Sequence, residues 1–93
     1  MQIYYFMLEA YPCSNNPEFK KHKGAYINCW VKAKSFSEAY DKVIDYLAWE
    51  KWELKHIEDS FIANREQYLN IPESLDCYDY ACEHGINAIF YLY

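Results

Sequence analysis

The sequence predicts a single α+β domain, and three observations support this. Its 93 residues leave room for one domain and no second. Hydrophobic residues make up 53% of the chain, aromatic residues 20%, and there are only two glycines, which is too apolar for a disordered chain. Stretches with the periodicity of strands alternate with stretches typical of helices, and no repeat or linker separates them.

The first third of the chain predicts two strands. Residues 2–11, QIYYFMLEAY, are rich in β-formers and contain no breaker. Residues 25–33, AYINCWVKA, alternate so that one face is clearly apolar. Between them, residues 12–24 contain two prolines, two asparagines and a closing glycine, which is typical of a loop. We expect the two strands to pair antiparallel across this loop, although it is long for a hairpin.

A helix is predicted from Ser35 to about Glu50. Ser35 and Glu38 have the spacing of a capping box, in which each side chain binds a free backbone N–H at the start of the helix. At 100° per residue, an apolar line of side chains runs along one side of this helix. Its members are Phe36, Tyr40, Val43 and Leu47, with Ala39 and Ile44 beside them.

The second half of the chain predicts a strand, a helix and a last strand. Residues 53–62, ELKHIEDSFI, alternate less regularly, which indicates a strand with a bulge. A connection with one helical turn follows, and residues 74–85 predict a helix that Ser74 or Asp76 caps and Gly85 ends. Residues 86–93, INAIFYLY, are apolar on both faces, so we expect this strand in the centre of the sheet.

The order of elements along the chain is therefore β–β–α–β–α–β. Strands that alternate with helices favour a mixed four-stranded sheet with both helices packed on one face. This fold class is ferredoxin-like in its general architecture.

The segment SLDCYDYACEHG at residues 74–85 gathers cysteines, acids and a histidine. On a helix, Cys77 and Cys82 lie about 140° apart around the axis and cannot share a metal ion. Zinc sites use close pairs such as C-x₂₋₄-C, and no such pair occurs. The pattern favours an amphipathic helix whose cysteine is a small core residue. The alternative is a metal site that recruits Cys13 or His22 from the long loop.

Other patterns typical of enzymes are missing. With two glycines in the whole chain there is no glycine-rich phosphate loop. His56 lies in a predicted strand without a nucleophile motif beside it. The adjacent acids Glu58 and Asp59 would point to opposite faces of that strand, which does not suit an acid and base pair. The sequence therefore predicts neither an enzyme nor a bound metal or cofactor.

The charge is unevenly distributed, although the net charge is −5. Residues 1–34 contain five lysines and two acids, whereas residues 35–93 contain four basic residues and twelve acids. A largely acidic chain argues against direct binding to nucleic acid, which needs basic residues to neutralise phosphates. It fits a basic protein partner instead.

Two features bear on the compartment. The start, MQIYYFMLEAYPC, lacks the basic region of a signal peptide, and no apolar stretch approaches the roughly 20 residues that span a bilayer. Without a secretory signal, we expect the four cysteines to be reduced thiols in a cytoplasmic protein that binds no membrane.

Trp49 is the one residue that does not fit a plain amphipathic helix. It lies about 220° from Phe36 around the helix, among polar side chains. An exposed tryptophan ringed by charges is typical of an interface hot spot. The alternative is that the helix ends early or that the loop at residues 12–24 covers the indole.

These features favour a small intracellular protein-binding domain that occludes its partner through an acidic, aromatic-rich surface. Inhibitors, toxin-immunity proteins and adaptors act in this way, and the partner would be a basic protein such as a nucleic-acid-handling protein or a toxin; a homodimer is also compatible. The predicted partner-binding residues are Trp49, Tyr46, Asp45, Glu38, Asp76, Asp79 and Glu83. The alternative is an enzyme or small-ligand domain that uses the open face of the sheet. Its pocket residues would be Tyr26, Asn28, Trp30 and His56.

Overall fold

The computed structural model describes residues 1–93 and confirms the α+β class and the order of the elements. The elements are β1 (Gln2–Pro12), β2 (Ala25–Ala33), α1 (Phe36–Trp49), β3 (Trp52–Ala63), a 3₁₀ helix (Arg65–Tyr68), α2 (Pro72–His84) and β4 (Ile86–Leu92). None of the helices combines the length and the hydrophobicity that crossing a membrane requires.

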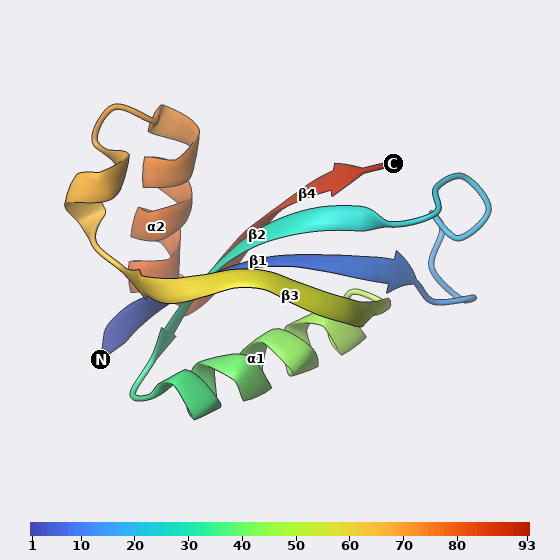
Figure 1. Ribbon diagram of the computed structural model, residues 1–93, viewed down its shortest axis with the longest axis horizontal. Helices are drawn as coiled ribbons and strands as arrows, with labels where there is room; N and C mark the ends of the chain where they lie inside the picture. The colour runs from blue at the N-terminus through green and yellow to red at the C-terminus, as the bar shows by residue number, and fades with distance from the viewer.

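The four strands form one sheet in the order β3-β1-β2-β4 (Figure 1). All three neighbouring pairs are antiparallel, so the prediction of a mixed sheet was wrong. The reason is that β2 and β3 both flank β1 and run against it, while β4 runs against β2. The prediction that the last strand is central was also wrong, because β4 lies at an edge. β1, which is buried on both faces, takes the central place.

The two helices cover opposite faces of the sheet, which corrects the prediction that both pack on one face (Figure 1). The cause lies in β1, whose side chains are apolar on both sides. Tyr4, Phe6 and Leu8 point toward α1, whereas Ile3 and Tyr5 point toward α2. A strand of this kind requires a cover on each face.

The larger core lies between the sheet and α1. It contains 13 buried residues, and α1 contributes Ala39, Val43 and Leu47 to it. The rings of Trp52 on β3 and Phe90 on β4 meet here with centroids 5.6 Å apart, so the two edge strands are linked beneath the central pair. Burial of this many apolar side chains is the main force that holds α1 to the sheet.

The helix ends follow local rules, with two departures from prediction. The Ser35 hydroxyl accepts a hydrogen bond from the Glu38 N–H at 3.2 Å, but the Glu38 carboxylate accepts from the N–H of Lys34 and not from that of Ser35. α2 begins at Pro72, before the predicted caps, because proline fits a first turn whose N–H groups need no partner within the helix. Gly85 ends α2 with φ of 101°, a conformation that favours glycine.

α2 covers only part of its face of the sheet. Cys77 and Ala81 are buried against the end of the sheet that holds Tyr5 and Trp30, and the other end of this face has no helix over it (Figure 1). We call this uncovered part the open face. From the strand register it contains Met7, Glu9, Tyr26, Asn28 and Tyr91.

Candidate functional site

The indole of Trp49 stands in solvent. Trp49 is 83% exposed, whereas Trp30 and Trp52 are 1% and 7% exposed. α1 extends through Trp49, and the loop between β1 and β2 does not cover the ring. The sequence left open whether Trp49 is exposed; the structure shows that it is, and neither an early helix end nor a covering loop occurs.

A groove of about 500 Å³ lies beside Trp49. It runs between the second half of α1 and the junction of α2 with β4. Its lining residues are Lys42, Asp45, Tyr46, Trp49, His84, Gly85 and Ile86. Three of the predicted partner-binding residues, Trp49, Tyr46 and Asp45, therefore line one hollow.

Two contacts hold the α1 wall of this groove in place. The Lys42 ammonium donates a hydrogen bond to the Lys32 carbonyl at 2.9 Å, which ties α1 to the end of β2. The ring of Tyr46 packs near Phe90, with centroids 6.4 Å apart. Burial, followed by the nearby Glu50 carboxylate, raises the pKa of Tyr46 to about 12.

The predicted acidic residues do not form one surface. Glu38 and Asp45 lie on α1, whereas Asp76, Asp79 and Glu83 lie on α2, across the sheet. Of this set, Glu83 lies closest in sequence to the groove, since it precedes His84. The predicted acidic residues therefore do not form a single binding face, and only those next to the groove, Asp45 and Glu83, can act together there.

Two of the predicted acids already have partners within the chain. The carboxylate of Asp79 accepts two hydrogen bonds from Arg65, at 2.8 and 3.0 Å, and this guanidinium lowers the pKa of Asp79. Glu38 lies 3.3 Å from the Lys42 ammonium, which lowers the pKa of Glu38. A carboxylate that is already paired within the chain attracts a basic partner more weakly than an unpaired carboxylate does.

The pocket predicted on the sheet does not form. Trp30 is buried under α2, and Asn28 accepts a hydrogen bond from the Tyr5 hydroxyl at 2.9 Å. Tyr26 packs against Tyr93 with ring centroids 5.2 Å apart. None of the hollows in the structure is lined by the four residues of this set. The enzyme or small-ligand function stays a prediction without a cavity to carry it.

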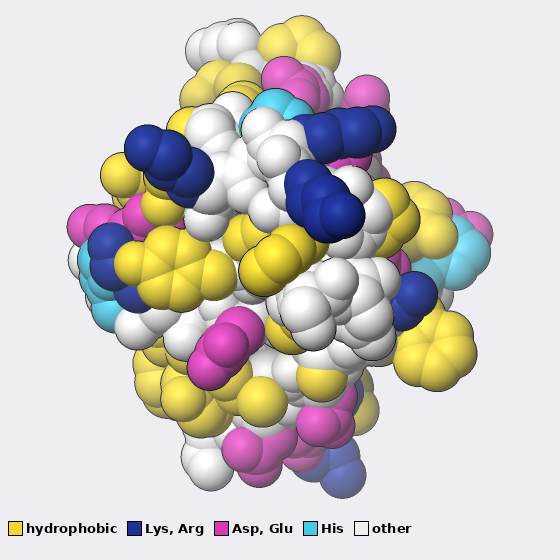
Figure 2. All heavy atoms as spheres, turned by 90° about the vertical axis from the view of Figure 1, so that its right-hand side faces the viewer, with side chains coloured by type: hydrophobic (Ala, Val, Ile, Leu, Met, Phe, Trp, Pro, Cys, Tyr) yellow, Lys and Arg dark blue, Asp and Glu magenta, His cyan; other side chains and the backbone are white.

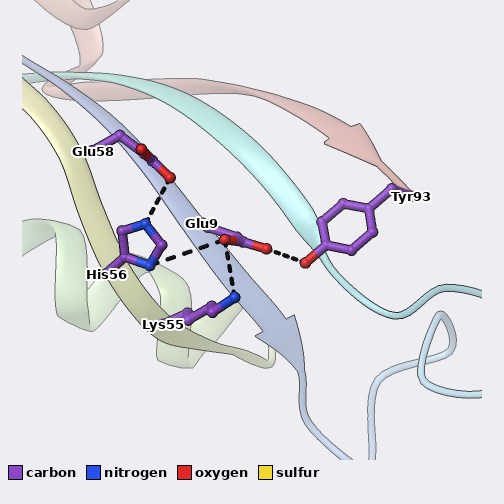
Figure 3. A network of polar contacts seen from close by, with 5 residues as sticks. All are labelled: Glu9, Lys55, His56, Glu58 and Tyr93. Carbon is purple, nitrogen blue, oxygen red and sulfur yellow. Dashed lines mark hydrogen bonds and ion pairs between the residues drawn. The ribbon is translucent and has the colours of Figure 1, made fainter.

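The open face instead contains a polar network around Glu9 (Figure 3). The pairing of β3 with β1 passes over Glu58, between Asp59 and Ile57, and over Lys55, between His56 and Leu54. The two bulges are therefore at Glu58 and Lys55. They account for the irregular alternation of this strand and bring Lys55 and His56 to the Glu9 carboxylate, with Glu58 beside His56.

The geometry shows what this network does. The Glu9 side chain is only 6% exposed; it lies 3.3 Å from the Lys55 ammonium and accepts a hydrogen bond from the Tyr93 hydroxyl. His56 Nδ1 lies 3.9 Å from Glu9, and His56 Nε2 lies 2.6 Å from Glu58 (Figure 3). The hydrogen bond from Tyr93, and then Lys55, lower the pKa of Glu9. A buried carboxylate with these partners stays ionised and ties three strands together.

Sequence reasoning missed Glu9, because a single glutamate in a strand is normally exposed and needs no partner. Glu9, His56 and Glu58 are also a group that could hold a metal ion, since their ligand atoms lie within 4.8 Å of one another. The Lys55 ammonium competes with any cation for the Glu9 oxygen. We therefore assign the network a role in stability.

The four cysteines are free thiols, which fits the prediction that they do not pair. Cys29 and Cys77 are buried, and Cys13 and Cys82 are half-buried.

Comparisons with models of protein families, with curated proteins and with solved structures found no match for this chain. The function is therefore inferred from the groove and its surroundings.

Proposed function

We propose that this chain is a small intracellular protein-binding domain that acts by occluding a basic surface of its partner, as inhibitors, immunity proteins and adaptors do. The observation that carries the proposal is the exposure of Trp49, 83%, at the rim of a groove. A chain that can bury two other tryptophans in its cores leaves this large ring in water.

The energetics favour a contact at this point. A tryptophan side chain buries roughly 150–250 Å² when it is covered, so its exposure leaves a large apolar area in water. Tryptophan and tyrosine are enriched among the residues that dominate binding energy. Here Trp49 and Tyr46 share one groove, so a side chain of the partner could lie between two aromatic rings.

The charges around the groove select the kind of partner. α1 contains three acidic residues and one lysine, and α2 contains four acidic residues with no lysine or arginine. Both helices end near the groove, and helix C-termini carry a partial negative charge. Exposed Asp45 and Glu83 add full charges, so a partner with lysines or arginines around an apolar residue is complementary.

The test compares three forms of the protein as bait in a lysate of the source organism. Trp49→Ala removes the anchor, and Leu69→Ala, at a site that is 54% exposed beyond the 3₁₀ helix, is the matched control. The expected result is a protein that the wild type and Leu69→Ala retain and Trp49→Ala loses. With the identified protein purified, Trp49→Ala should weaken Kd about 30-fold, or ~2 kcal/mol. Equal retention by all three forms would contradict the proposal.

A further inference from the structure

One edge of β4 has no neighbouring strand; among the backbone groups on it, the Ala88 N–H donates to the Asn87 Oδ1 at 2.9 Å. At the two ends of its pairing with β2, the Lys32 N–H binds the Gly85 carbonyl at 2.8 Å and the Tyr93 N–H binds the Gly24 carbonyl at 3.0 Å. Backbone groups in an antiparallel pair alternate in direction, so odd-numbered residues of β4 face β2. The N–H and C=O groups of Ile86, Ala88 and Phe90 therefore point away from the sheet.

The two edges of the sheet differ in their protection. β3, at the other edge, has two bulges and five charged residues or histidines in its middle, all of which discourage an added strand. These residues are Glu53, Lys55, His56, Glu58 and Asp59. β4 has an unbroken register with β2, no proline and no charged residue. An apolar edge of this kind is a template for a further strand.

The two halves of β4 have different surroundings. Ile86, at its start, lines the groove, so this half is flanked by Trp49 of α1 on one side and by His84 at the end of α2 on the other. We call this half the slot. At the other end of β4, beyond Phe90, Tyr91 and Leu92 are 49% and 40% exposed. We call this end the tongue.

We propose that a second copy of the chain pairs with this edge, β4 against β4, around a twofold axis. Antiparallel pairing places the tongue of each copy in the slot of the other and continues the sheet to eight strands. Leu92 is on the α1 side of β4, like Phe90, and so reaches toward the partner's groove; Tyr91 is on the α2 side. Slot and tongue occur on one strand in the order that a twofold axis pairs, which is why a second copy fits better than an unrelated strand.

The charges agree with this arrangement. The tongue ends beside a basic loop, since the Lys23 N–H donates to the Tyr93 carbonyl at 2.8 Å. Lys20 and Lys21 belong to the same loop, and Figure 2 shows lysine side chains beside exposed hydrophobic rings on this end of the molecule. The slot of the other copy carries Asp45 and lies next to Glu83, and its one lysine, Lys42, is already paired with Glu38. Antiparallel pairing therefore brings basic and acidic ends together twice.

Pairing of this kind covers Trp49, so self-association and the binding of a basic partner exclude each other. The inference does not rest on the proposed function, because it follows from the β4 edge. A monomer that captures a partner would refute only the dimer, whereas a dimer that captures nothing would refute only the proposed function.

The experiment measures the mass of the purified chain by sedimentation equilibrium from about 1 µM to about 1 mM, a range that covers dimers with Kd in that interval. The variant Leu92→Asp places a charge on the tongue at an exposed site, opposite the acidic slot, and Leu69→Asp is the control away from β4. We expect a dimer whose Kd rises about tenfold or more in Leu92→Asp and stays unchanged in Leu69→Asp. Circular dichroism verifies that both variants are folded.

A second readout uses the tryptophans. Trp30 and Trp52 are buried, so quenching by acrylamide reports mainly on Trp49. Quenching of the wild type should fall as its concentration rises and should stay high in Leu92→Asp. A monomer over the whole range, or a dimer that Leu92→Asp leaves intact with Trp49 still open to acrylamide, would overturn the proposal.

Discussion

The hydroxyl of Tyr93 donates a hydrogen bond to the carboxylate of Glu9, a residue 84 positions earlier in the chain. β2 lies between β1, which carries Glu9, and β4, which Tyr93 follows, so this contact crosses a strand. The same carboxylate lies 3.3 Å from Lys55 on β3. One side chain therefore connects both edges of the sheet.

The Glu9 contacts predict a pH dependence of stability. The pKa of Glu9 lies below its ordinary value of 4.5 in the folded protein, so ionised Glu9 stabilises the fold fully above about pH 4.5 and loses this effect as pH falls further. Glu9→Gln should lower the free energy of unfolding most at pH 7, and the difference should shrink below pH ~4.5. Urea denaturation of both proteins at several pH values measures this. A difference that is constant with pH would contradict the assignment.

Gly24 predicts a second stability effect at the same place. A Cβ at this position would lie 2.5 Å from the Tyr93 Oη and 2.9 Å from the carbonyl oxygen of Ala10. The ring can move aside, but the backbone oxygen belongs to the central strand. Gly24→Ala should therefore destabilise the protein by about 1–3 kcal/mol, as overpacking does. Chemical denaturation measures the loss of stability. An unchanged midpoint would contradict the prediction, because it would show that the backbone around residue 24 makes room for the methyl group without destabilising the fold.

Trp49 and Trp52 provide a matched pair for stability. Trp49→Ala removes a ring that makes few contacts with the rest of the protein, so the free energy of unfolding should change by less than about 0.5 kcal/mol. Trp52→Ala removes a ring from the larger core and should cost about 3–5 kcal/mol. Denaturation of the two variants needs no partner. A large loss in Trp49→Ala would make Trp49 a structural residue.

The cysteines should react in two classes. Burial raises the pKa of Cys29 to about 12 and also raises the pKa of Cys77, so both thiols stay protonated and covered. Half-buried Cys13 and Cys82 should react with a thiol reagent in the native protein, and all four should react after denaturation. Fewer than four thiols in the denatured, unreduced protein would reveal a disulfide.

The groove acids predict how salt affects binding to the captured partner. Asp45→Lys together with Glu83→Lys should slow association, and the loss should shrink near 1 M salt, where the Debye length is about 3 Å. Asp79 is a poor choice for this test, because its reversal also breaks the pair with Arg65. Stopped-flow kinetics measures the rate. A rate that is insensitive to charge and salt would remove electrostatics from the mechanism.

The sequence predicted the elements well where one periodicity was clear. Residues 25–33 alternate regularly, and β2 spans the same residues. The arrangement of elements was harder, because the run QIYYFMLEAY is apolar on both faces and was not interpreted as a need for two covers. INAIFYLY is also apolar on both faces, yet β4 has only one neighbouring strand. Hydrophobicity alone does not separate a central strand from an edge strand that α-helices flank.

The candidate site was predicted in part. The helical wheel placed Trp49, Tyr46 and Asp45 on one side of α1, and the groove brings these three together. Periodicity could not place the α2 acids relative to them, because that depends on which face of the sheet each helix covers. The Glu9 network depends on two bulges in β3; the irregular alternation of residues 53–62 indicated one bulge, but it fixed neither its position nor the existence of the second.

The two helices rest on cores of unequal size, 13 buried residues under α1 and 7 under α2. Local opening costs less free energy where fewer apolar contacts must be broken. We therefore expect the α2 side to open while the sheet and α1 remain folded, and its amide hydrogens to exchange with solvent first. The free energy of local opening should therefore be lower on the α2 side of the sheet than on the α1 side. The end of α2 flanks the groove, so one wall of the groove belongs to the less stable side.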